Sequence, residues 1–421
     1  TMWTGSDTFG TYGAGLDKKG VAPSFRWGIG TSDEFFVGIY HLDNHNGIHY
    51  GLPWLQKSAT NTKRVLVPVD PDEYFGLDSD YSESTATYGT LGHLHRFKGG
   101  GELKTTFRAG RYKRDQRAST VRFCTRTTNP TTGAVTNPNC PTSVTGETLN
   151  DSTVLTRGSQ NKIQDLDTRL LQSDYSGSFE GFGMKHAVLA GVDLADDDFV
   201  GYTAVVPAGV NLTKPTTTLG NPDDGASVAE SLRDVLKNRD FDSSARGVYF
   251  QDMIQVAPHW KILGGVRWDS FEGTYRTFST AGASLGQQTA RRGRSDSLWS
   301  KRFGVLYQPT PLSSFHLSYG TSFNTSGDTY QYDALGSNTD PESSRNIELG
   351  AKLESESGNL STRFAVFHST KYNERNRDEE SVNPTNYVLS GRRHAAGLEV
   401  DVAGRISHAW EVYASYAWIP K

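Results

Sequence analysis

The sequence lacks any apolar run approaching the roughly 20 residues that a membrane-spanning helix requires. Hydrophobic residues make up 35% of its 421 residues, and the mean hydropathy is −0.55. These values exclude a helical membrane protein. They do not exclude a membrane β-barrel, because lipid-facing apolar residues alternate with wet inward residues there and cancel in a hydropathy window.

The sequence also lacks a strong charge of either sign. The formal net charge is −4 and the pI is about 6.3, so no basic footprint indicates nucleic acid. Neither HExxH, a Walker loop nor a dinucleotide fingerprint occurs, and these motifs carry common metal-assisted hydrolytic, phosphoryl-transfer and hydride chemistry. The sequence therefore predicts neither an enzyme nor a nucleic-acid-binding protein.

Metal-ligand patterns are equally scarce. His41, His45 and His49 are spaced by four residues, but they fall on a strand end and a loop, where that spacing defines no common face. The acidic clusters 196–198 and 378–380 fall in expected loops, where solvation is favoured over a calcium site. We expect no metal site and no intrinsic cofactor.

Cysteine occurs only at Cys124 and Cys140. The segment between them is rich in Pro, Gly and Asn, and an even count within one polar loop favours a local disulfide in an oxidising compartment. The alternative is two unpaired thiols. A zinc knuckle is not favoured, because no His or second Cys pair lies nearby at the required spacing.

What the sequence does contain is glycine and aromatic residues in alternating patterns: 44 Gly, 19 Tyr, 20 Phe and 8 Trp. The clearest unit is a hairpin over 303–323, with a strand-breaking turn at 309–314. The apolar positions of its two arms are Phe303, Val305, Tyr307, Phe315, Leu317 and Tyr319. Small or polar residues alternate with them, so the hairpin predicts a sheet with one apolar and one wet face.

About fourteen such strand-like runs follow one another, joined alternately by turns of roughly two to seven residues and loops of roughly fourteen to fifty. Outer-membrane barrels show this asymmetry, with short periplasmic turns and long outer loops. A propeller would show a period of about 40–45 residues, and a sandwich would need Greek-key crossings. The sequence therefore predicts an all-β fold, a transmembrane up-and-down antiparallel β-barrel.

Long loops are expected over 42–81, 114–165, 197–242 and 324–343, and in the Gly-, Arg- and Ser-rich stretch that ends near Ser297. Within one of them, apolar residues at helical spacing over 227–237 predict a short surface helix, with Glu230 paired to Arg233. The chain begins TMWTGSDTFG, without the features of a signal peptide, and ends within what reads as a hairpin. We expect a piece of a longer chain.

Several stretches carry a family resemblance: VAPSFRWGIGT and GLPW early on, KRFGVLYQPTPLSSFHLSYGTSF, DPESSRNIELGAKLE, AVFHSTKYNER, YVLSGRRHAAGLEVDVAGRI and WEVYASYAW. In these the sequence resembles the TonB-dependent outer-membrane receptors of the ferric-siderophore group, and GLPW is similar to the catecholate-type members. The resemblance implies a barrel of about 22 strands plugged by an N-terminal domain. Residues 1–421 would be part of that barrel domain, without plug or closing strands.

A ferric catecholate is bulky, anionic and aromatic, so its vestibule should offer Arg or Lys for charge and aromatic rings for packing. The candidates at the loop ends are Tyr50, Trp54, Arg111, Tyr112, Arg114, Arg291, Arg292, Arg294, Tyr330, Tyr332, Tyr372, Arg375 and Arg377. Each could instead be a solvated loop residue or an interface aromatic. The inward residues expected to pair with lumen acids or with the plug are Arg267, Arg363 and Arg393.

The resemblance implies a receptor in the bacterial outer membrane for high-affinity binding and energy-coupled uptake of ferric siderophores. Fe3+ would be carried as the siderophore complex. The implied partners are the siderophore, outer-membrane lipid and lipopolysaccharide, and the TonB-ExbB-ExbD energising complex acting through the plug. Two alternatives remain: the same scaffold importing cobalamin, haem or an oligosaccharide, and a soluble all-β carbohydrate-binding or adhesin module.

Overall fold

The computed structural model describes the backbone of residues 2–8, 15–222, 224–325, 332, 337, 339–377 and 387–420. Of these residues, the side chains are described from 15 to 374 and from 392 to 420. Tyr330 lies outside the described residues, as do the side chains of Arg375 and Arg377 and the acidic cluster 378–380. Among the described residues, no helix is long and apolar enough to cross a membrane.

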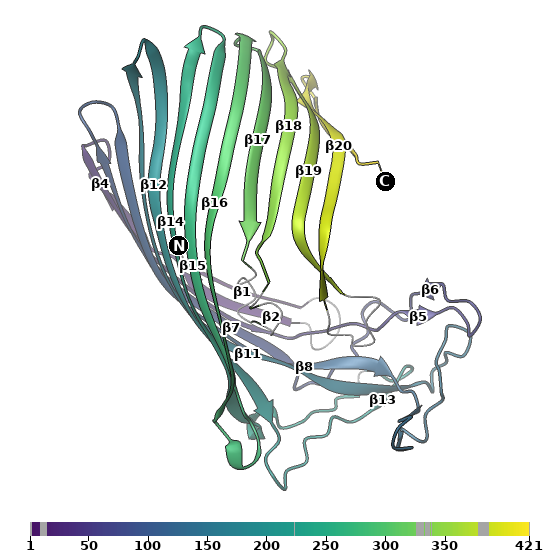
Figure 1. Ribbon diagram of the computed structural model, residues 1–421. Coiled ribbons are helices and arrows are strands. Elements are labelled where there is room, and N and C mark those ends of the chain that lie inside the picture. The colour runs from purple at the N-terminus through teal and green to yellow at the C-terminus, as the bar shows by residue number, and fades with distance from the viewer. Residues whose placement is uncertain are drawn as a thin grey trace.

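Antiparallel strands make up the fold (Figure 1). The main strands are β1 (Met2–Thr8), β2 (Gly15–Val21), β3 (Ser24–Trp27), β4 (Asp33–Asn46), β7 (Tyr81–Arg96), β8 (Glu102–Phe123), β11 (Val154–Gly181), β12 (Met184–Val205), β14 (Asp234–Ala257), β15 (Trp260–Phe278), β16 (Gln288–Thr310), β17 (Ser313–Asn324), β18 (Glu342–Glu354), β19 (Leu360–Arg377), β20 (Tyr387–Ser407) and β21 (Trp410–Trp418). The short ones are β5 (Leu55–Gln56), β6 (Arg64–Val65), β9 (Thr127–Thr128), β10 (Val135–Thr136) and β13 (Thr217–Thr218).

Seventeen of these strands form one sheet, in which each main strand except β2 pairs with the next along the chain. β2 and β3 pair with successive parts of β4 and are separated at Ala22 and Pro23, because proline cannot donate to a ladder. Without β13, sixteen of the seventeen described strands form this series, and they fill fifteen positions because β2 and β3 share one. The short turns lie at the top of Figure 1 and the long loops at the bottom, so the predicted up-and-down order is confirmed.

Alternation along the strands gives the sheet two faces. Phe303, Tyr319 and Ile347 lie opposite one another on β16, β17 and β18, and all three are exposed. We call their side the outer face. On the other side, the inner face, Arg267 pairs with Asp193 at 2.6 Å, so the expected inward position of this arginine is confirmed.

The strands extend farther toward the long-loop end than the sequence predicts. β8 reaches Phe123 and β11 begins at Val154, within an expected loop, and β16 begins at Gln288. These extensions pair with each other in register, for example Arg122 with Thr156. They lack a regular apolar face, and their polar composition predicts loops instead.

The prediction of a surface helix over 227–237 is wrong. Only Glu230–Leu232 forms a single 3-10 turn, and the chain then enters β14, where residues 234–237 pair with β12. Pairing with a neighbouring strand overrides the helical spacing of the apolar residues. The expected contact between Glu230 and Arg233 is present, with Nε and Oε2 separated by 2.8 Å.

Cys124 and Cys140 form the disulfide that the sequence predicts. Cys124 follows β8 directly, and its backbone N–H donates to the Val154 carbonyl at 2.8 Å. The bridge therefore ties the polar segment 125–139 to the end of the β8–β11 pair.

Replacing both cysteines with serine should loosen the 125–139 segment without unfolding the sheet. A disulfide that closes a loop of about 15 residues lowers the entropy of the unfolded chain and so stabilises the folded state by about 3 kcal/mol. The sequence separation of the two cysteines here is 16. Protease cleavage within 125–139 should become faster in the double variant, and reduced wild type should match it. Equal cleavage of oxidised wild type and double variant would contradict a restraining role for the bridge.

Candidate functional site

Aromatic and arginine side chains form a row across the inner face near the long loops. The register places Phe199, Phe241, Tyr275 and Arg292 opposite one another on β12, β14, β15 and β16. We call these four residues the aromatic–arginine row. Arg239 lies beside it, with its guanidinium carbon 5.8 Å from the Phe199 ring centroid.

Tyr332, which follows β17 in a long connection, packs on this row. Its ring centroid lies 5.4 Å from that of Phe241 in an edge contact, and both side chains are buried. Gly273 leaves room for them, because a Cβ there would lie 3.0 Å from the Phe241 ring and 3.1 Å from the Tyr332 hydroxyl, which is tighter than most Cβ contacts. Phe241 and Tyr332 thus fasten this connection to the inner wall.

The two inner-face arginines of β16 differ in their surroundings. Arg294 is buried; it donates to Asp296 at 2.5 Å and to the Thr339 carbonyl at 2.5 Å. Arg292 is half-buried, and within the described part of the chain it has no hydrogen-bond or ion-pair partner. An uncompensated guanidinium beside aromatic rings is suited to an anionic aromatic ligand.

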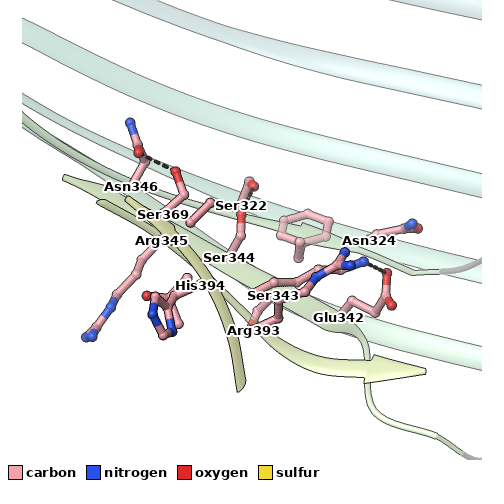
Figure 2. A pocket seen from close by; sticks show the side chains of 14 residues that line it. Ser322, Asn324, Glu342, Ser343, Ser344, Arg345, Asn346, Ser369, Arg393 and His394 are labelled. Carbon is pink, nitrogen blue, oxygen red and sulfur yellow. Dashed lines mark hydrogen bonds and ion pairs between the residues drawn. The ribbon is translucent and has the colours of Figure 1, made fainter. Parts of the chain in front are cut away.

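A hollow of about 590 Å³ lies on β17 to β20, beside the same connection (Figure 2). Its inner-face lining includes Ser322, Ser344, Asn346, Ser369, Lys371 and Arg393. Figure 2 shows Asn346 and Ser369 directed to one side of the sheet, joined by a hydrogen bond of 2.6 Å, whereas Arg345 and His394 point to the other side. The hollow therefore offers hydroxyl and amide groups to a polar ligand.

The cations of this hollow are held by carboxylates. Lys371 Nζ lies 3.1 Å from Glu342 and 3.5 Å from Glu374. Arg393 Nη2 lies 2.5 Å from Glu374, which confirms its expected pairing with an inward acid. Because the charges compensate one another, this hollow is less attractive to an anion than the row around Arg292.

The long loops at this end are fixed by a buried polar cluster. We call Asp80, Ser119, Lys214, Glu230 and Arg233 the loop-anchoring cluster. Lys214 Nζ lies 3.1 Å from Asp80 Oδ1 and 2.9 Å from Ser119 Oγ, and Glu230 lies between Lys214 and Arg233. The cluster joins the loops 47–80 and 206–233 to the extension of β8.

Two titratable groups of this loop region are shifted by burial. Burial raises the pKa of Tyr81 to about 12, with the Asp115 carboxylate acting in the same direction. Burial lowers the pKa of His49, more than the nearby Asp80 carboxylate raises it. Both side chains are therefore neutral at neutral pH, and neither adds charge to the site.

Two of the predicted site residues come together through a residue that the sequence did not single out. Gln116 Nε2 donates to the Tyr50 hydroxyl at 2.6 Å, and Arg114 donates to Gln116 Oε1. Gln116 is fully buried. Trp54, on the same loop as Tyr50, is exposed.

Other predicted residues lie on the outer face. Arg111 shares the parity of Phe107 on β8, and its Nε lies 2.8 Å from Asp167 Oδ1. Arg291 is exposed and adjacent to inward Arg292, so the register places it on the outer side. Tyr372 also lies on this side, with the Arg345 guanidinium carbon 5.6 Å from its ring centroid.

Residues 24–421 match the family model described as TonB dependent receptor-like, beta-barrel. The catecholate siderophore receptor Fiu of Escherichia coli strain K12 is 25% identical over 441 residues, covering 96% of this chain and 55% of that protein. The probable TonB-dependent siderophore receptor PiuA of Acinetobacter baumannii is 24% identical over 428 residues, covering 97% and 53%. This chain spans about half the length of these curated relatives.

A third relative, the metal-pseudopaline receptor CntO of Pseudomonas aeruginosa, is 26% identical over 265 residues, covering 59% of this chain and 34% of that protein. Among solved structures, PiuA from Acinetobacter baumannii has a TM-score of 0.78 at 20% identity and covers 98% of this chain and 57% of that one. The closed form of Fiu from K12 E. coli has a TM-score of 0.75 at 20% identity and covers 97% and 58%. These structures share the fold of this chain. Because the family model matches residues 24–421, nearly the whole chain, the chain belongs to the TonB-dependent receptor-like β-barrel family.

Proposed function

We propose that this chain is barrel wall from an outer-membrane receptor that binds ferric siderophores and takes them up in an energy-coupled way. The names of the curated relatives support the ligand class, because Fiu is a catecholate siderophore receptor and PiuA a probable siderophore receptor. In this role Fe3+ is cargo carried by the siderophore, and the protein makes no covalent bond to it.

The observation that carries the proposal is the position of Arg292 on the inner face, in register with Tyr275 and without a partner among the described residues. A ferric catecholate presents negative charge on aromatic rings, which a guanidinium beside aromatic side chains recognises by charge and by stacking. The proposed ligand-contacting residues are Tyr50, Trp54, Arg114 and Arg292. Arg294 and Tyr332 position the connection that covers the row.

The outer face supports placement in a bilayer. Its exposed apolar side chains on β16 to β18 would meet lipid, and the short turns would then be periplasmic. Farther toward the long loops, Arg111 and Asp167 face outward as an ion pair of 2.8 Å, at the level where head groups and lipopolysaccharide would lie. The energising partner TonB-ExbB-ExbD would act through a plug; the name of the matched family, TonB dependent receptor-like, supports the TonB part of this proposal.

A binding comparison tests the ligand class. The full-length protein, purified in detergent, should bind a ferric catecholate more tightly than a ferric hydroxamate or cobalamin. A metal–pseudopaline complex is a useful further ligand, since CntO matches part of the chain. Equal or tighter binding of cobalamin, or no binding of any iron complex, would contradict the proposal.

A further inference from the structure

Two histidines and one aspartate converge on the outer face at the short-turn end of the sheet. Asp33 is the first residue of β4, and His93 and His95 lie near the end of β7. Their ligand atoms, one nitrogen of each ring and one carboxylate oxygen, all lie within 4.8 Å of one another. This group lies far along the strands from the aromatic–arginine row and belongs to no site described above.

The convergence follows from strand geometry. Residues two apart on a strand point to the same face, so His93 and His95 are directed alike. The register places Asp33 directly opposite His95 on the neighbouring strand. As a result Asp33 Oδ1 lies 2.7 Å from His95 Nδ1 and 3.0 Å from His93 Nε2.

Aromatic neighbours hold both imidazole rings. The His93 ring stacks on Phe35, with centroids 4.6 Å apart and 14° between the planes. The His95 ring meets Phe97 edge-on at 4.6 Å. Rings fixed in this way lose little side-chain entropy when they bind a ligand, which favours tight binding.

The three side chains remain exposed on one side, beside the short turns at the edge of the sheet. Their exposed fractions are 41% for Asp33, 40% for His93 and 34% for His95. An ion can therefore reach them, and water or another oxygen ligand can complete its coordination. Two imidazole nitrogens and one carboxylate oxygen are a ligand set that suits zinc and copper.

We propose that Asp33, His93 and His95 form a binding site for a divalent transition metal ion of the Zn2+ or Cu2+ type, which joins β4 to β7 at the rim of the barrel. Ligand atoms around a tetrahedral zinc ion lie about 3.3 Å apart, given bond lengths of about 2.0–2.1 Å. The observed separations of 2.7 and 3.0 Å differ from this by well under an ångström. The two histidine nitrogens lie within 4.8 Å of each other, so binding an ion requires them to approach each other by no more than about 1.5 Å.

A nearly matched pair on the same face lacks the third ligand. His186 Nδ1 lies 2.7 Å from Asp252 Oδ2, and its ring stacks on Phe179 with centroids 4.9 Å apart. Like the proposed site, this pair lies near a short turn, but it offers one imidazole rather than two. His186 is therefore an internal control for histidine–aspartate pairs that serve only packing and charge compensation.

The test is Cu2+ and Zn2+ binding by the full-length protein in detergent, produced without a histidine tag. Wild type should bind one Cu2+ with an electron paramagnetic resonance spectrum showing two imidazole nitrogens. His93→Gln and His95→Gln should each leave one nitrogen and weaken Zn2+ binding by more than about tenfold. Asp33→Asn should weaken it in the same direction, whereas His186→Gln should leave it unchanged.

Thermal unfolding provides a second readout, because an ion that binds only the folded state stabilises it. Zn2+ should raise the unfolding temperature of wild type and of His186→Gln, and should leave that of His93→Gln/His95→Gln unchanged. Unaltered metal affinity and spectrum in a folded His93→Gln/His95→Gln variant would overturn the proposal. So would loss of the site in His186→Gln alone.

Discussion

Replacing Asp80 with alanine should release the loops 47–80 and 206–233 from the sheet. The expected cost is about 3–5 kcal/mol, typical of removing one partner of a buried ion pair. Both side chains of the Asp80–Lys214 pair are at most 2% exposed, so water cannot take the place of the lost carboxylate. Lys214 would be left as a buried charge near Glu230, at 3.8 Å.

Asp80 is also an acceptor for the backbone. Its Oδ2 accepts from the N–H of Ser119 at 2.9 Å and from the N–H of Leu77 at 3.1 Å. Hydrogen–deuterium exchange in the full-length protein should therefore become faster in residues 206–222 and 74–80 of Asp80→Ala. The matched control is Asp78→Ala, two residues away and exposed, which should leave exchange unchanged.

The double variant Asp80→Ala/Lys214→Met distinguishes the cost of leaving Lys214 charged and buried from the other effects of removing the Asp80 side chain. Replacing a buried ion pair by apolar side chains removes the unpaired buried charge, so the double variant should recover the protection that is lost through the charge of Lys214, but not the part that depends on the two backbone hydrogen bonds of Asp80. Equal exchange in wild type and Asp80→Ala would show that the loop-anchoring cluster does not hold these loops.

Phe241→Ala should free Tyr332 from the inner wall. Phe241 is fully buried, and truncating a buried phenylalanine to alanine costs about 3–5 kcal/mol through lost contacts and a cavity. Here the cavity would open directly beneath the Tyr332 ring. Fluorescence of a probe attached near Tyr332, or protease access to the connection after β17, should report the release.

Phe241→Leu is the milder control, because leucine fills more of the buried space than alanine does and should therefore cost less than Phe241→Ala. It should keep the connection protected and ligand affinity near wild type. Protection that is equally strong in Phe241→Ala would contradict the packing role of the aromatic–arginine row.

The wall could be predicted from the sequence because its alternation is strict where one face is apolar. Phe303 and Tyr319 of the central hairpin lie opposite each other in the structure, as their spacing indicates. The same rule failed toward the long loops, where residues such as Arg122 and Thr156 pair in a ladder that has no apolar face. Backbone hydrogen bonding leaves no mark on composition, so the sequence of these extensions predicts loops.

The candidate site was predictable in kind but not residue by residue. Arg291 and Arg292 are adjacent and alike in sequence, and only the register separates the outer side chain from the inner one. The roles of Gln116 and Lys214 could not be foreseen, because their partners Tyr50 and Asp80 are 66 and 134 residues away. For Phe199 the sequence offers only a weak indication, namely an aromatic residue within the part of β12 that extends toward the long loops.

The most direct test of the proposed function compares ferric catecholate binding by Arg292→Gln and Arg291→Gln in the full-length protein. The two changes remove the same charge from neighbouring residues on opposite faces of β16. Loss of a charged hydrogen-bond donor costs about 1.5–3 kcal/mol, so Arg292→Gln should weaken binding roughly tenfold or more, and Arg291→Gln should not. Equal affinities for the two variants would contradict a ligand site on the inner face.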